Sequence, residues 1–146
     1  FENINKKLHE IELKNNRSEL INTKNNKILL DAYNANPTSL SLAIRSFHEF
    51  LKTQGSKESL IILGDMLELG KYSLKYHQKI VHLLKKYDFK NCILIGENFQ
   101  QTNTNYQKTP SIDKYLLLLK KNQIKNKIIL IKGSRKMKLE KLLDVL

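Results

Sequence analysis

The hydrophobic residues of this chain fall into short continuous runs that alternate with longer segments in which they recur every three or four positions. Continuous apolar runs are typical of strands buried on both faces, and the longer spacing is typical of helices that cover them. The expected strands are 28–30, 59–63, 92–95 and 128–131, with a short edge strand at 20–23. The expected helices are 38–53, 71–87, one opened by Thr109 and Pro110, and 137–146.

This alternation predicts the α/β fold class. Parallel strands need long crossover connections, which the helical segments supply. We expect a small doubly wound, Rossmann-like sheet, mostly parallel, with four or five parallel strands, one antiparallel edge strand and helices on both faces. Residues 97–108 are polar and are expected to form a loop with room for one helical turn. A length of 146 residues suits one domain with a proper core.

Each central strand is followed by a turn that carries polar residues or glycine. The carboxyl ends of parallel strands meet at one edge of the sheet, where open α/β folds bind ligands. The turns are 31–36, 64–70, 96–97 and 132–135. In the first, Asn36 suits the N-cap of the next helix and Pro37 its first position, and free helix-terminal amides favour anions. An ordinary capped turn explains the same residues, so both interpretations stay open for this stretch.

Several side chains in these turns suit an anionic or nucleotide ligand. Lys132 and Arg135 supply cations and Ser134 a hydroxyl, a set that can hold a carboxylate or a phosphate. Asp31 can accept hydrogen bonds from ribose hydroxyls, as acidic residues do in nucleotide-binding folds. The alternatives are that Ser134 only caps the last helix and that the acids of residues 64–70 only form a solvated turn.

Neither a metal site nor a phosphate loop is expected. His77 and His82 are five positions apart in one predicted helix, which is the wrong spacing for a shared metal ion. No Gly-x-x-x-x-Gly-Lys-Ser/Thr loop occurs in the sequence.

The net charge of +12 raises the possibility of a nucleic-acid-binding module. The basic residues are nearly all lysine, spread along the chain, and arginine occurs only at positions 17, 45 and 135. Arginine is the usual choice for bidentate base and phosphate contacts, so a solvated lysine surface is favoured. The single cysteine, Cys92, lies in an apolar run and fits a core position in a reducing cytoplasm. No apolar run approaches the roughly 20 residues of a membrane helix.

Three stretches resemble the signature blocks of one family, the Mur ligases. They are residues 31–40 (DAYNANPTSL), 62–70 (ILGDMLELG) and 131–140 (IKGSRKMKLE). Within the family they resemble the branch that joins D-alanyl-D-alanine to UDP-N-acetylmuramoyl-tripeptide, in order and spacing. The Tyr-Asn-Ala-Asn-Pro core of the first block is much more specific than a lone glycine motif.

The resemblance implies one domain of a three-domain cytoplasmic enzyme of peptidoglycan synthesis. Such ligases activate the tripeptide carboxylate with ATP as an acyl phosphate, which the dipeptide amine attacks. Residues 1–16 would be the tail of the preceding ATPase domain and the hinge, and 17–146 the C-terminal domain, which binds the amino substrate. The alternatives are the same domain of another Mur or folylpolyglutamate-type ligase, or a basic nucleic-acid-binding module.

The resemblance also implies roles for particular residues. Nucleotide-binding positions would be Arg17, Asp31, Tyr33 and Asn34. Positions on the amino-substrate side would be Asn34, Asn36, Lys132, Ser134 and Arg135. ATP and magnesium would be held mainly by the central domain, which also supplies the phosphate loop and is not in this sequence. The expected partners are that domain, ATP, UDP-N-acetylmuramoyl-tripeptide and D-alanyl-D-alanine, and the chain alone is expected to lack catalytic residues and ligase activity.

Overall fold

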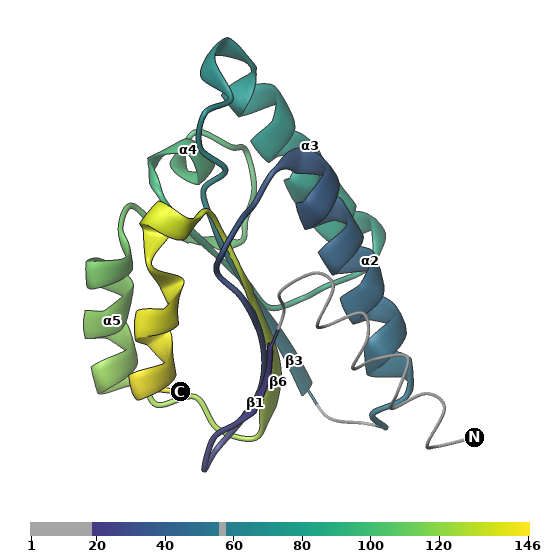
Figure 1. Ribbon diagram of the computed structural model, residues 1–146, viewed down its shortest axis with the longest axis vertical. Coiled ribbons are helices and arrows are strands. Elements are labelled where there is room, and N and C mark those ends of the chain that lie inside the picture. The colour runs from purple at the N-terminus through teal and green to yellow at the C-terminus, as the bar shows by residue number, and fades with distance from the viewer. Residues whose placement is uncertain (1–18, 56–57) are drawn as a thin grey trace.

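The computed structural model describes residues 19–55 and 58–146, which form one mixed sheet covered by helices on both faces (Figure 1). The strand order is β1-β2-β6-β3-β4-β5, with β1 antiparallel to β2 and every other pair parallel. The strands are β1 (Glu19–Asn22), β2 (Lys27–Asp31), β3 (Glu58–Gly64), β4 (Cys92–Ile95), β5 (Gln107–Thr109) and β6 (Lys127–Lys132). The predicted fold class is confirmed. The predictions for residues 1–16 and Arg17 lie outside the described residues.

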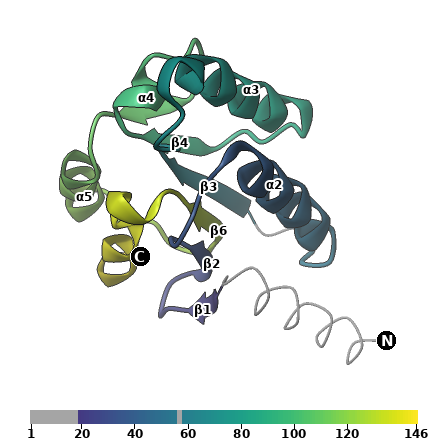
Figure 2. The same cartoon turned by 45° about the horizontal axis from the view of Figure 1, so that its top comes forward.

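Two helical layers enclose the sheet. Helices α2 (Pro37–Lys52) and α3 (Ser73–Lys86) cover one face, and α5 (Ile112–Lys121) and the 3₁₀ segment η3 (Leu139–Asp144) cover the other (Figure 2). Side chains of β3 alternate between the layers, since Ile61 belongs to the core under α2 and α3 and Ile62 to the core under α5. Within the described residues, no helix combines the length and hydrophobicity needed to cross a membrane.

The first central strand and its helix form as the sequence predicts. Asn36 is the N-cap of α2, and its side chain accepts a hydrogen bond from the amide of Ser39 at 2.8 Å. The Ser39 hydroxyl accepts one in return from the Asn36 amide at 3.0 Å, which completes a capping box. Pro37 occupies the first turn, and Leu40 and Ile44 are fully buried. The polar turn is therefore fixed at its helical end by its own side chains.

Cys92 is a core residue, as predicted. It is 3% exposed, and burial raises the pKa of its thiol to about 12. A thiol that stays protonated at neutral pH is a poor nucleophile, so its contribution is to packing.

Residues 97–108 contain more structure than expected. They form the short helix α4 (Glu97–Gln100) and most of β5, which pairs in parallel with β4. The sequence hides β5 because its residues are polar and it is held by backbone pairing at the sheet edge. The expected cap Thr109 ends this strand, and the N-cap of α5 is Ser111, whose side chain accepts from the Lys114 amide.

The prediction of a helix at residues 137–146 is wrong. The chain forms two 3₁₀ segments instead, η2 (Arg135–Met137) and η3, separated by Lys138 with φ at +53°. A left-handed residue cannot continue a right-handed helix, so the segment breaks there. The buried residues of η3 are Leu139 and Leu142, spaced by three, and this matches the period of a 3₁₀ helix.

Candidate functional site

Four polar turns meet at the carboxyl edge of the sheet, by which we mean the ends of β2, β6, β3 and β4. These strands are consecutive neighbours and run parallel, so their last residues lie side by side. Asp31 is opposite Lys132 in the register of β2 and β6, and Gly64 is opposite Ile95 in β3 and β4. The expectation that the four turns share one edge is confirmed.

The two predicted site residues closest to the sheet, Asp31 and Lys132, form a buried ion pair. Asp31 is 6% exposed and Lys132 2% exposed. The Lys132 ammonium donates to the Asp31 carboxylate and, at 2.9 Å, to the carbonyl of Asn34. Lys132 therefore ties the turn after β2 to the end of β6. The sequence alone suggested an Asp31 side chain open to ligand, whereas the structure buries it.

A second pair of predicted residues stands further out. The Arg135 guanidinium carbon lies 5.5 Å from the centroid of the Tyr33 ring, which is a cation–π contact. Tyr33 is 47% exposed and Arg135 is also exposed. This contact brings together a residue expected on the nucleotide side and one expected on the substrate side.

The two asparagines of the first turn are exposed. The backbone carbonyl of Asn34 accepts a hydrogen bond from Lys132, and this contact fixes the turn. Asn36 uses its side-chain oxygen to cap α2. A capping role for Asn36 is thus present, and its role toward a ligand stays a prediction.

Ser134 connects the turn after β6 with the turn after β3. Its hydroxyl accepts a hydrogen bond from the Leu67 amide at 3.1 Å, and its own amide donates to the carbonyl of Asp65 at 3.2 Å. Ser134 is 9% exposed and makes no side-chain cap to η2. The alternative that it only caps a helix is therefore wrong.

Two glycines allow these turns to approach so closely. A Cβ on Gly133 would lie 2.6 Å from a methyl carbon of Leu139 and 3.0 Å from the Cα of Gly64. A Cβ on Gly64 would lie 3.0 Å from the same methyl carbon. The ends of β3 and β6 can thus pack beneath Leu139 only without side chains at these positions.

Asp65 is structural in a way that the sequence did not reveal. It is 3% exposed, and its carboxylate accepts from the amides of Asn98 and Phe99, each at 2.9 Å, and from the Asn98 side chain at 3.1 Å. It therefore caps α4, whose own N-cap, Gly96, has no side chain. The alternative of a solvated turn is wrong for Asp65 and correct for Glu68, which is exposed.

His77 is the other residue at this edge that sequence reasoning did not assign. Its ring is fully buried, 0% exposed, and Nε2 accepts a hydrogen bond from the Met66 amide at 3.0 Å. Because Nε2 is an acceptor, the proton is on Nδ1, which donates to the Ser73 carbonyl at 2.7 Å. Burial lowers the pKa of the imidazole, an effect that the Ser73 carbonyl and Asp65 partly oppose. The signal in the sequence was its helical spacing with the apolar residues of α3, since His77 precedes Ile80 and Val81 by three and four positions.

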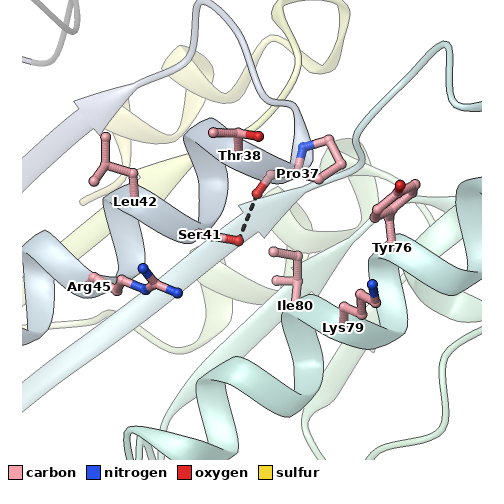
Figure 3. Close-up of a pocket in the computed structure, with 8 residues that line it drawn as sticks. All are labelled: Pro37, Thr38, Ser41, Leu42, Arg45, Tyr76, Lys79 and Ile80. Carbon is pink, nitrogen blue, oxygen red and sulfur yellow. Dashed lines mark hydrogen bonds between the residues drawn. The ribbon is translucent and has the colours of Figure 1, made fainter.

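A shallow groove between α2 and α3 lies beside the edge (Figure 3). It measures about 410 Å³, and Arg45 of α2 and Lys79 of α3 line it together with Leu42 and Ile80. A neighbouring hollow of about 680 Å³ includes Asn36. Neither hollow is lined by Asp31, Lys132, Ser134 or Arg135.

Comparison with known proteins places this chain in a family. The model of the Mur ligase, glutamate ligase domain, matches residues 16–135. A UDP-N-acetylmuramoyl-tripeptide–D-alanyl-D-alanine ligase of Rickettsia prowazekii is 30% identical over 95% of this chain and 31% of its own length. The ligase of the same name from Bacillus subtilis is 33% identical over 86% of this chain and 29% of its own. The chain thus spans about a third of these curated relatives.

Solved structures agree on the fold. The MurF ligase of Thermotoga maritima in complex with ADP superposes with a TM-score of 0.70, at 20% identity, over 89% of this chain and 30% of that one. A MurF structure from Acinetobacter baumannii gives 0.64 at 21% identity, over 88% of this chain and 30% of that one. The family model covers most of the sequence and the sheet topology fits, so the chain belongs to the Mur ligase family, as its glutamate ligase domain.

Proposed function

We propose that this chain is the C-terminal domain, residues 17–146, of an ATP-dependent ligase that adds D-alanyl-D-alanine to UDP-N-acetylmuramoyl-tripeptide in cytoplasmic peptidoglycan synthesis. The observation that carries the proposal is the match of curated ligases of that name to 95% and 86% of the chain. Because the chain spans about a third of those ligases, residues 1–16 and the remaining domains would supply the ATPase machinery, with Arg17 at the hinge.

In this proposal the amino substrate binds along the turns after β2 and β6. Arg135 is exposed beside Tyr33 and would hold the dipeptide carboxylate, since guanidinium–carboxylate pairs are strong and directional. Lys132 is buried and would act by fixing Asn34 through its carbonyl. Asn34, Asn36 and the Ser134 turn would then orient the dipeptide so that its amine faces the activated carboxylate.

The nucleotide would contact the outer rim of this edge. At this rim the half-exposed Tyr33 ring offers a flat surface and Asn34 an amide. The buried Asp31 lies behind them and would offer an acceptor for ribose hydroxyls once the domain closes. This set fits a peripheral contact, because Asp31 is already engaged by Lys132. ATP supplies the phosphoryl group that activates the tripeptide carboxylate.

No magnesium ligand is assigned to this chain. Within residues 19–55 and 58–146, no group of three or more His, Cys, Asp or Glu side chains is placed to hold a metal ion. As the family resemblance implies, magnesium and the nucleotide phosphates would be held mainly by the preceding domain.

The test is ligase activity of the complete enzyme that carries this domain. With ATP and UDP-N-acetylmuramoyl-tripeptide, we expect product and ADP with D-alanyl-D-alanine, and none with glutamate or other single amino acids. Preference for a single amino acid would assign the chain to another branch of the family. The 146-residue chain alone should give no turnover, and clear turnover would contradict the assignment of catalysis to other domains.

A further inference from the structure

His77 lies at the centre of a small hydrogen-bond network behind the carboxyl edge. It sits in the second turn of α3, and its ring packs edge-on against Phe99 with 4.6 Å between centroids. Both ring nitrogens are bonded to backbone groups, Nε2 to the Met66 amide and Nδ1 to the Ser73 carbonyl. The ring is fully buried, so its polar atoms act only inside the protein.

The amide that His77 holds is the middle one of three backbone groups fixed in succession. Ser134 bonds the Asp65 carbonyl through its amide and the Leu67 amide through its hydroxyl. His77 bonds the Met66 amide between them. Two of the three contacts therefore come from the turn after β6 and one from α3, so His77 and Ser134 hold the same short backbone segment.

We propose that His77 is a positioning residue for the amino substrate, holding the backbone of residues 65–67 so that Ser134 and the adjacent Arg135 are presented correctly. This inference rests on the proposed function, because it takes the turn after β6 to be the dipeptide side of the site. The competing account is that His77 only satisfies two buried backbone groups and stabilises the fold.

Protonation of His77 would release the Met66 amide, because Nε2 would become a donor. The charged group that faces the ring is the Asp65 carboxylate, with 3.8 Å between Nε2 and Oδ1. From α4 the ring meets Phe99, and from its own helix the Ser73 carbonyl and hydroxyl. Burial lowers the pKa of the imidazole, so the neutral, accepting form prevails at neutral pH.

Two substitutions separate positioning from packing. His77→Phe keeps an aromatic ring but removes the acceptor, whereas His77→Gln puts a carbonyl oxygen near the place of Nε2. In the complete ligase, we expect His77→Phe to raise the KM for D-alanyl-D-alanine about tenfold, equivalent to about 1.4 kcal/mol. In His77→Gln the KM for the dipeptide should lie within about threefold of the wild-type value. Neither variant should change the KM for ATP by more than about twofold. His82→Gln, at an exposed position on the same helix, is the control and should match wild type.

The outcomes divide cleanly. A wild-type ligase that does not use the dipeptide would overturn the proposed function, and this inference with it. A wild-type ligase that uses it, with unchanged dipeptide KM in His77→Phe, would overturn this inference alone. An equal increase in the KM for ATP and for the dipeptide would also overturn it, and so would a dipeptide KM in His77→Gln as high as in His77→Phe. Both results fit a purely structural role.

A second measurement covers the case in which His77→Phe does not fold. The dipeptide KM of His77→Asn is compared with that of His77→Gln, because the asparagine side chain is one methylene shorter and its carbonyl oxygen does not reach the place of Nε2. The dipeptide KM should be about tenfold higher in His77→Asn than in His77→Gln, and the KM for ATP should differ by less than about twofold. Equal dipeptide KM values in the two variants would overturn the inference.

Discussion

Two carboxylates, Asp31 and Asp65, lie at the carboxyl edge of the sheet and have different surroundings. Asp31 is the last residue of β2 and Asp65 directly follows β3, and both are nearly buried, at 6% and 3% exposure. Asp31 faces a cation, Lys132, in the register of β2 and β6. Asp65 faces backbone amides of α4 and a neutral histidine. Both strand-end carboxylates are thus buried, but Asp31 pairs with a lysine of the neighbouring strand and Asp65 caps a helix.

The two carboxylates also differ in the exposure of the residues near them. The turns that follow Asp31 and Lys132 carry the exposed contact between Tyr33 and Arg135. Asp65, in contrast, is closed in by Phe99, the buried His77 and Gly96. We therefore treat Asp65 as part of the framework and Asp31 as the inner wall of a ligand site, and the following predictions test that division.

The largest effect is expected for Gly96→Ala, which attacks the framework. A Cβ there would lie 2.2 Å from the Asp65 carboxyl carbon, and the φ of +126° is unfavourable for any L side chain. We expect the free energy of unfolding to fall by more than about 3 kcal/mol in urea denaturation. Gly55→Ala is the control, because its φ is +72° but its Cβ would meet no atom within 4 Å. That change should cost about 1 kcal/mol, and equal losses would refute the close-packing argument.

The next effect concerns the ion pair at the ligand site. Asp31→Asn removes the counter-charge of a buried lysine, so we expect a loss of about 2–3 kcal/mol in the free energy of unfolding. Adding Lys132→Met should recover part of that loss, because no buried charge then remains. In the complete ligase, Asp31→Asn should also weaken ATP use. If Asp31→Asn alone leaves the free energy of unfolding unchanged, the ion pair contributes nothing to stability.

How far the sequence predicts this molecule depends on whether the controlling contacts are local. The four central strands and α2 follow from hydrophobic runs and from the Asn36–Pro37 start signal, which lie within a few residues of what they determine. The strand β5 has no such signal, since pairing with β4 holds its polar residues. In the site, the shared edge was predictable from parallel strands, whereas the contact of Asp31 with Lys132 joins residues 101 positions apart. The role of Asp65 likewise depends on α4, which lies 33 positions further along.

A smaller effect should appear in the pH dependence of stability, through His77. The folded state lowers the pKa of this histidine, so below about pH 6.5 the unfolded chain binds a proton that the native state resists. This contribution is therefore complete above pH 6.5 and is lost as pH falls, at no more than about 1.4 kcal/mol per pH unit. The wild-type free energy of unfolding should thus decline more steeply from pH 7 to 5 than that of His77→Gln. Parallel curves would mean that His77 titrates normally in the folded state.

The smallest expected effect, and the one that best separates framework from ligand site, is that of Ser134→Ala. Its hydroxyl joins the two regions, because it accepts from Leu67 beside Asp65 and belongs to the turn beside Lys132. Loss of one partly buried hydrogen bond should lower the free energy of unfolding by about 1 kcal/mol. Ser41→Ala is the matched control, since that hydroxyl only donates to the Pro37 carbonyl within α2, where alanine is a good helix former. We expect Ser41→Ala to leave stability and dipeptide kinetics near wild type.

In the complete ligase, Ser134→Ala should lower kcat/KM for D-alanyl-D-alanine by more than its stability loss explains, with the KM for ATP nearly unchanged. The reason is that Leu67 and Arg135 would no longer be held by a common residue, so the two turns could move independently at the point where the dipeptide must be oriented. If the variant loses stability but keeps wild-type dipeptide kinetics, Ser134 belongs to the framework together with Asp65. The amino substrate would then be recognised at Asn34 and Asn36 in the turn after β2. The turn after β6 would belong to the framework around Asp65, and only the turn after β2 would belong to the ligand site.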